Sequence, residues 1–168
     1  ILKKKFSNIS KVIILPCGIS SKKETLKLKI NTSNPLISTF SDHWNKGRFS
    51  NSKWDKVINV DTTTLDQLIN DYGHPKFIKI DVEGFELEVL KGLTKKTGII
   101  SFEFTSEFFK DAIKCLDYLN KLGYKKFNYS EGERKKFNFD WTSKDKILEE
   151  IENKIKTSDY LWGDIYTQ

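Results

Sequence analysis

The fold is decided by residues 77–92, which read FIKIDVEGFELEVLKG. This stretch begins as a short apolar run of the length of a buried strand, and then meets the carboxylates of Asp81 and Glu83 and a glycine, Gly84. After the glycine, apolar residues recur at helical spacing: Phe85, Val89, Leu90 and Leu93. Sheets of α/β proteins usually present side chains to a ligand where a strand ends and turns into a helix, so we expect an α/β fold with a site here.

A purely structural interpretation of this strand end is also open. Charged residues are common at the ends of strands, and Glu83 would lie near a helix N-terminus, where the helix dipole favours negative charge. The functional interpretation of Asp81 and Glu83 therefore depends on the wider pattern around them.

The wider pattern extends on both sides of the stretch. The segment KIDVEGFELEVLKG at 79–92 is preceded by TLDQL at 64–68, and is followed by IISFEF at 99–104, a helix pattern and LGY at 122–124. In this order the chain resembles the FkbM-type methyltransferases, over about residues 57–125. The resemblance is fairly specific, because it rests on a long pattern in the right order and not on a lone glycine motif.

The resemblance implies both a fold and an activity. The fold would be a Rossmann-like class I methyltransferase sheet of seven strands, mostly parallel with an antiparallel last strand, and this chain would carry the third to the seventh strand. The activity would be transfer of a methyl group from S-adenosylmethionine to an oxygen, or less readily a nitrogen, of a small hydroxylated acceptor such as a sugar.

Three carboxylates are the candidate site residues. Asp81 is predicted to face the cofactor and to act as the base that takes the acceptor's proton. Glu83 is predicted to share the catalytic role; alternatively, the two acids hold a divalent metal such as Mg²⁺, which prefers oxygen ligands. Glu103 lies on an apolar strand and is predicted to line the same cleft and bind the substrate; the alternative is a salt bridge to a nearby lysine, since a buried charge needs a partner.

Two further contacts are predicted from loops. In the resembled family the turn after the third strand lies beside the adenine, which makes Gly18 and Ile19 the predicted cofactor contacts; the alternative for Gly18 is turn geometry alone. Residues 31–56 show no clear period, and a loop of this length is usually either functional or mobile. Within it, His43 is a candidate substrate contact or base, although a lone loop histidine is more often a surface residue.

The remaining sequence alternates between strand and helix patterns. Strands are predicted at 11–16, 24–30, 57–60, 99–105, 124–129 and 159–166, and two of the helices between them begin at the caps Thr64 and Thr142–Ser143. A length of 168 residues suits one domain with a real core. We therefore predict a single α/β domain spanning residues 1–168.

Composition excludes several classes of partner. The net charge of +6 comes from scattered lysines without an arginine cluster, so no nucleic-acid partner is predicted. No apolar run reaches membrane-spanning length, so no membrane association is predicted. The two cysteines, Cys17 and Cys115, lie far apart and indicate a reduced, cytoplasmic setting. The sequence specifies no oligomeric state.

One expected part of a cofactor-binding domain is missing from the sequence. The strand, glycine-rich turn and helix that normally cradle such a cofactor have no counterpart here. The chain also begins at Ile1 and contains no methionine. We therefore expect a fragment that does not bind S-adenosylmethionine by itself. The alternative is a non-catalytic α/β remnant or interaction module.

Overall fold

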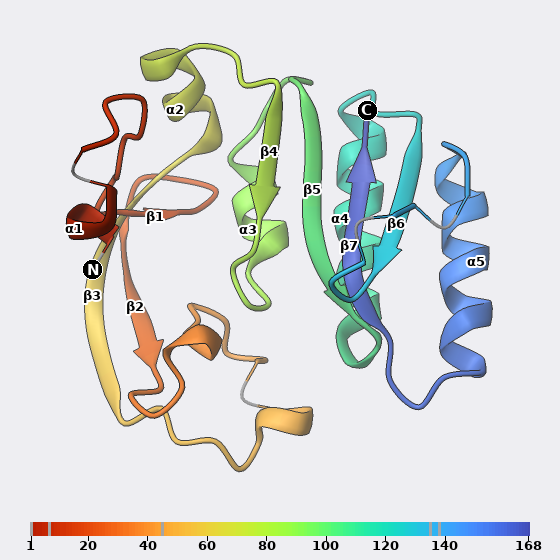
Figure 1. The fold of residues 1–168 in the computed structure, drawn as a ribbon, viewed down its shortest axis with the longest axis horizontal. Helices are drawn as coiled ribbons and strands as arrows, with labels where there is room; N and C mark the ends of the chain where they lie inside the picture. Colours follow the sequence, from red (N-terminus) through yellow and green to blue (C-terminus); the bar gives the residue numbers. More distant parts are fainter. Residues whose placement is uncertain (1, 7, 45, 135, 138) are drawn as a thin grey trace.

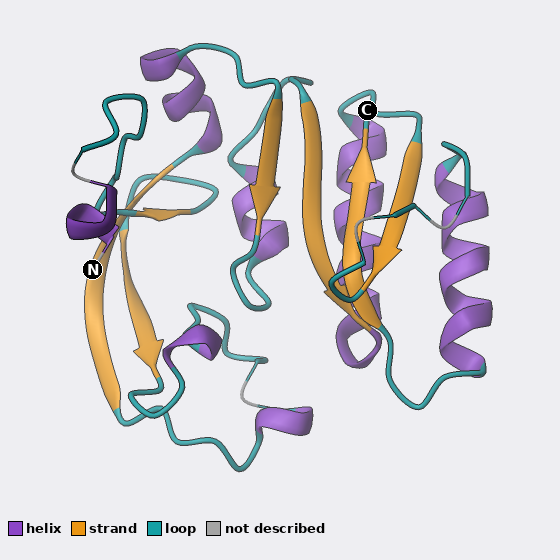
Figure 2. Ribbon diagram, in the orientation of Figure 1, coloured by secondary structure: helices purple, strands orange, loops and turns teal. Residues whose placement is uncertain are grey.

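The computed structural model describes residues 2–6, 8–44, 46–134, 136–137 and 139–168. Within them the chain is mixed α/β, with two sheets and five α-helices (Figures 1 and 2). Three short 3₁₀ turns, Pro35–Ile37, Gly47–Phe49 and Ser106–Phe108, lie in the connections. None of the helices described is both long enough and apolar enough to cross a membrane.

The smaller sheet comes from the first part of the chain, after the short helix α1 (Leu2–Phe6). Its order is β1 (Gly18–Ile19), β3 (Lys56–Thr63) and β2 (Thr25–Ile30). Strand β3 pairs parallel with β1 and antiparallel with β2.

The predicted strand at 11–16 is wrong. The structure assigns no strand to these residues, and Val12, Ile13 and Leu15 are exposed. The apolar pattern is genuine, but an extended segment becomes a strand only when a neighbour completes its hydrogen bonds, and no described strand pairs with this one.

The larger sheet contains the strand of the stretch 77–92, which decides the fold (Figure 1). Its order is β4 (Phe77–Ile80), β5 (Ile99–Thr105), β7 (Trp162–Thr167) and β6 (Phe127–Glu131). Strand β4 pairs parallel with β5, whereas β7 lies between β5 and β6 and runs antiparallel to both. The predicted antiparallel last strand is therefore present.

The described pairings do not show the mostly parallel sheet that the sequence predicts. Two of them are parallel, β1 with β3 and β4 with β5, and three are antiparallel. The difference has two sources. Strand β7 inserts between two strands that run the same way, and β2 pairs antiparallel with β3.

Four longer helices follow the predicted pattern: α2 (Leu65–Tyr72), α3 (Glu86–Lys91), α4 (Phe109–Lys121) and α5 (Lys144–Lys156). Helix α2 begins at Thr64, whose side chain accepts a hydrogen bond from the Gln67 backbone N–H at 3.1 Å, as the capping pattern predicts. The next three helices pack one against the next, and their apolar faces close a core with β5, β6 and β7. Its fully buried members include Leu90, Phe102, Leu116, Phe127, Ile151 and Ile165.

Loops join the two sheets and bring the first part of the chain to the end of β4. The Asp66 backbone N–H donates to the Gly92 carbonyl at 2.9 Å, and the Asp66 carboxylate accepts from the Thr94 hydroxyl at 2.7 Å. On the other side of β4, the Thr39 hydroxyl donates to the Glu83 carbonyl at 2.7 Å. The long loop between β2 and β3 therefore contacts the predicted site directly. That residues 1–168 form one domain stays a prediction.

Candidate active site

The turn between β4 and α3 carries two of the predicted site residues. Strand β4 ends at Ile80, and α3 begins at Glu86. In between, Glu83 has a φ of +54°, the only positive φ of a non-glycine residue in the described chain, and Gly84 has a φ of +86°. Two successive residues with positive φ reverse the chain sharply, and this conformation is costly for a residue with a side chain.

This turn lies against a cleft of about 590 Å³. Carboxylate oxygens of Asp81, Glu83 and Glu103 all lie within 4.8 Å of one another, so the ends of β4 and β5 bring the three predicted acids together. The remaining wall comes from β4 and the turn that follows it, from the loop after β2, from the turn after β6 and from β7. It consists of Leu36, Ser38, Lys79, Val82, Gly132, Glu133, Trp162 and Asp164.

Lys79 interacts with two acids of the cleft, Asp81 and Asp164. Its ammonium group donates a hydrogen bond to Asp164 on β7 and lies 3.5 Å from the Asp81 carboxylate. Burial lowers the pKa of Lys79, but the hydrogen bond and charge of Asp164, together with the charge of Asp81, outweigh this effect and raise the pKa above its usual value. Lys79 therefore stays positively charged in the cleft at neutral pH.

The fold changes the protonation of Glu103 strongly. Burial and, next, the negative charges of Asp81 and Glu86 raise the pKa of Glu103 from 4.5 to about 7, while the charge of Lys79 opposes the rise. Asp164 lies directly opposite Glu103 in the β5–β7 pairing and adds to the effect. The cleft thus contains a carboxyl group that changes charge near neutral pH.

This raised pKa predicts how stability depends on pH. In the folded protein Glu103 keeps its proton up to about pH 7, whereas the unfolded chain releases it near 4.5. The folded state therefore binds more protons in this window, and the free energy of unfolding should fall as pH rises from 4.5 to about 7. Glu103→Gln should flatten this slope in urea unfolding measured across the window.

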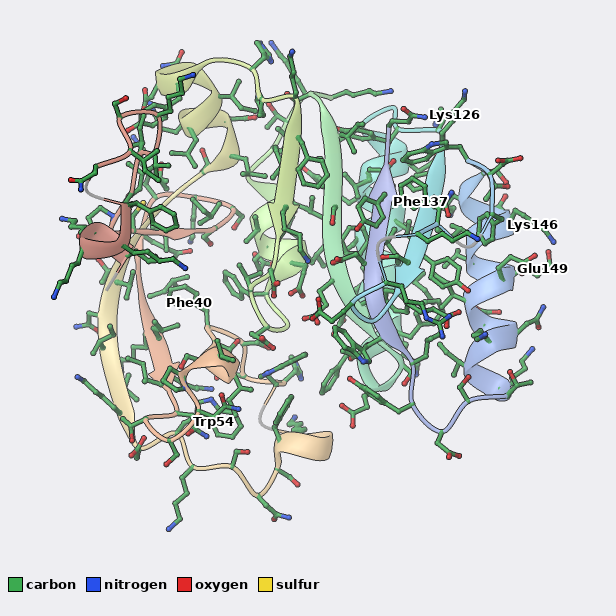
Figure 3. All side chains as sticks on the ribbon, viewed as in Figure 1. Phe40, Trp54, Lys126, Phe137, Lys146 and Glu149 are labelled. Carbon is green, nitrogen blue, oxygen red and sulfur yellow. The ribbon has the colours of Figure 1, made fainter. Side chains whose placement is uncertain are left out.

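The control for this experiment is Glu149→Gln, on the exposed face of α5 (Figure 3). It removes one carboxylate without touching the cleft. If this control flattened the slope as much as Glu103→Gln does, the burial of Glu103 would not be its source.

The arrangement of the three acids also bears on the prediction of a divalent metal. Three carboxylates that converge within 4.8 Å offer the hard oxygen ligands that Mg²⁺ and similar divalent cations prefer. Glu103 thus extends the predicted pair of Asp81 and Glu83 to a possible ligand set of three. Metal binding at this place stays a prediction.

The other predicted contacts do not line the cleft. His43 lies at a separate hollow of about 640 Å³, beside Glu107, Phe108 and Lys114. A substrate role for His43 stays a prediction, but the structure does not bring it to Asp81. Its neighbour Trp44, like Thr39 of the same loop, does reach the turn: it is buried, and a Cβ atom built on Gly84 would lie 2.8 Å from the indole ring.

Gly18 and Ile19 form strand β1, opposite Thr62 and Thr63 of β3. A Cβ atom on Gly18 would lie 3.0 Å from the ring of Phe40, which is labelled in Figure 3 and packs against Phe85 with ring centroids 5.5 Å apart. Close packing thus accounts for a glycine at this position. The predicted contact of Gly18 and Ile19 with a cofactor stays a prediction.

Several residues of the cleft were missed from the sequence. Lys79 could have been found, because residues 79 and 81 share one face of a strand. Glu133, Trp162 and Asp164 carried no such signal, since only the position of β7 in the sheet brings them to β4.

Comparison with known protein families identifies the chain. The model of the methyltransferase FkbM domain matches residues 3–126, which is more than half of the 168 residues and includes the turn with Asp81 and Glu83 as well as Glu103. No curated protein and no solved structure gives a significant match. The match confirms the resemblance seen in the sequence: the chain belongs to the FkbM methyltransferase domain family.

Proposed function

We propose that this protein transfers a methyl group from S-adenosylmethionine to a hydroxyl oxygen of a small acceptor such as a sugar, in the cleft beside Asp81. One observation carries the proposal. In a chain of a methyltransferase family, the carboxylates of Asp81, Glu83 and Glu103 converge in one cleft at the ends of two adjacent parallel strands.

The charge of the cleft suits a cationic donor. Among its described lining residues, five carboxylates face a single lysine, whereas the whole chain has 29 Lys and Arg against 23 Asp and Glu. The acids are Asp81, Glu83, Glu103, Glu133 and Asp164. Such a lining attracts a positively charged sulfonium group. When bound, S-adenosylmethionine supplies an electrophilic methyl group.

The residues of the cleft then have distinct tasks. As the acceptor oxygen bonds to the methyl carbon and the carbon–sulfur bond breaks, Asp81 takes the proton of the acceptor hydroxyl. Glu103 accepts a hydrogen bond from the acceptor and fixes its orientation. Lys79, held by Asp164, keeps the Asp81 side chain near the end of β4. Orientation of this kind supplies much of the rate gain in a reaction between two bound partners.

The lining also predicts which acceptors are used. A phosphorylated sugar would bring negative charge beside Asp81, Glu83, Glu133 and Asp164 as well as the partly protonated Glu103, and like charges in contact oppose binding. We expect kcat/KM for a sugar phosphate to be at least about tenfold lower than for the matched unphosphorylated sugar.

The experiment that tests both statements is an assay with S-adenosylmethionine labelled in its methyl group, carried out on the full-length protein. The acceptor panel contains a neutral sugar, the corresponding amino sugar and the sugar phosphate. Equal kcat/KM for the sugar phosphate and the neutral sugar would contradict the predicted charge selectivity, but not methyl transfer itself. Absence of labelled product from every acceptor in the panel would count against methyl transfer and favour the alternative, a non-catalytic α/β module.

A further inference from the structure

One carboxylate near the cleft does not face it. Glu86, the first residue of α3, is 9% exposed. It lies behind the turn, at a small enclosed hollow that Trp44, Gly84 and Glu103 also line. A carboxylate is rarely buried to this degree unless it is hydrogen-bonded, so its partners indicate its task.

The partners of Glu86 are the backbone groups of the turn. Its Oε1 accepts a hydrogen bond from the Gly84 N–H at 3.1 Å. Burial raises the pKa of Glu86, and hydrogen bonds from the backbone N–H groups of Glu86, Gly84 and Val82 oppose this rise. The Glu86 side chain is thus hydrogen-bonded to the backbone of the turn at Gly84, directly after the reversal at Glu83.

This reversal needs such support. The positive φ angles of Glu83 and Gly84 are unfavourable unless the surroundings hold them. The loop before β3 also contacts the turn: the Thr39 hydroxyl donates to the Glu83 carbonyl, and the Trp44 indole lies against Gly84. The loop and Glu86 therefore both hold the turn in place.

We propose that Glu86 is a positioning residue. Its buried carboxylate fixes the backbone at 82–84, so that the carboxylates of Asp81 and Glu83 converge on Glu103. Glu86 does not line the cleft and touches no acceptor. The effect on catalysis rests on the proposed function, whereas the effect on the geometry of the turn does not.

The test compares three variants of the full-length protein. Glu86→Ala removes every acceptor atom, Glu86→Gln keeps one oxygen acceptor, and Glu88→Gln is the matched control two residues further along α3, where the carboxylate binds Ser21 and Lys91 near the surface. Glu86→Ala should lower kcat by about 100-fold, the effect of a misplacement of about 1 Å, and leave the KM of the acceptor within about threefold of its normal value. Glu86→Gln should lose less than about tenfold in kcat, and Glu88→Gln should match the unmodified protein.

A second measurement needs no activity. Amide hydrogen exchange at Gly84 should be about tenfold faster in Glu86→Ala, because its hydrogen bond to the Glu86 carboxyl group is lost, while exchange at the buried Leu116 stays unchanged. Unchanged exchange at Gly84 would overturn the proposed geometry. Faster exchange with normal kcat would overturn the positioning role.

If Glu86→Ala does not fold, Glu86→Gln takes its place in both measurements, with smaller changes expected in the same direction. If the unmodified protein transfers no methyl group, the proposed function fails. Hydrogen exchange at Gly84 then remains the test of whether Glu86 holds the backbone of the turn.

Discussion

Asp81→Asn lowers kcat for methyl transfer by at least about 100-fold and leaves the fold intact; this is the first expected result. Asparagine has nearly the shape of aspartate but cannot take a proton from the acceptor hydroxyl, and a positioned base typically contributes a factor of about 10²–10⁴. The Asp81 side chain is 53% exposed, and its contact with Lys79 is a partly exposed ion pair, which stabilises by about 1 kcal/mol at most. The substitution should therefore separate activity from stability.

Steady-state kinetics and urea unfolding of the same preparation check this result. The control is Asp145→Asn, which changes an acid that is 90% exposed at the start of α5 and leaves the cleft untouched. Full activity of Asp81→Asn would eliminate Asp81 as the base. A parallel loss of stability would mean that the carboxylate serves the fold instead.

The second large effect is expected at Gly84. Gly84→Ala places a side chain at a φ of +86°, which costs roughly 1–2 kcal/mol, and sets its Cβ 2.8 Å from Trp44, an overpacking that costs about 1–3 kcal/mol. We expect the free energy of unfolding to fall by about 2–5 kcal/mol. Methyl transfer should fall with it, because the turn that carries Asp81 and Glu83 has to shift.

The chain offers a matched control for this change. Gly73 has a similar φ of +91°, and an added Cβ there would meet nothing within 4 Å. Because Gly73 also has a ψ of 173°, a backbone region essentially restricted to glycine, Gly73→Ala should show a backbone cost of about 1–3 kcal/mol without any steric contact. A larger loss in Gly84→Ala would then come from the contact with Trp44. Equal losses in urea unfolding would show that Trp44 yields freely and does not hold the turn.

The sequence predicted for a physical reason that Asp81 and Glu103 would lie in one cleft. Residues 77–80 and 99–105 are short apolar runs, and both proved to be strands. Neighbouring parallel strands end at the same edge of a sheet, so Asp81 and Glu103 had to come close once β4 and β5 paired. Local patterns were sufficient here because the pairing joins two segments that follow each other in the chain.

Other parts of the site depend on pairing between distant segments, and local patterns carry no information about it. Lys79 and Asp164 are 85 positions apart, and they meet only because β7 enters the sheet beside β5. The same insertion, together with the antiparallel pair of β2 and β3, accounts for the difference from a mostly parallel sheet. The prediction of a strand at 11–16 was wrong because a local pattern carries no information about pairing, and none of the described strands pairs with this segment.

The place of β7 also determines when this sheet is completed during synthesis. Strands β5 and β6 each pair with β7 in the described sheet and not with one another. While a nascent chain still lacks residues 162–167, β6 has no strand beside it, and one wall of the cleft, with Trp162 and Asp164, does not yet exist. The apolar residues of β5 and β6 therefore lack this shared partner strand until β7 has been synthesised and joins them.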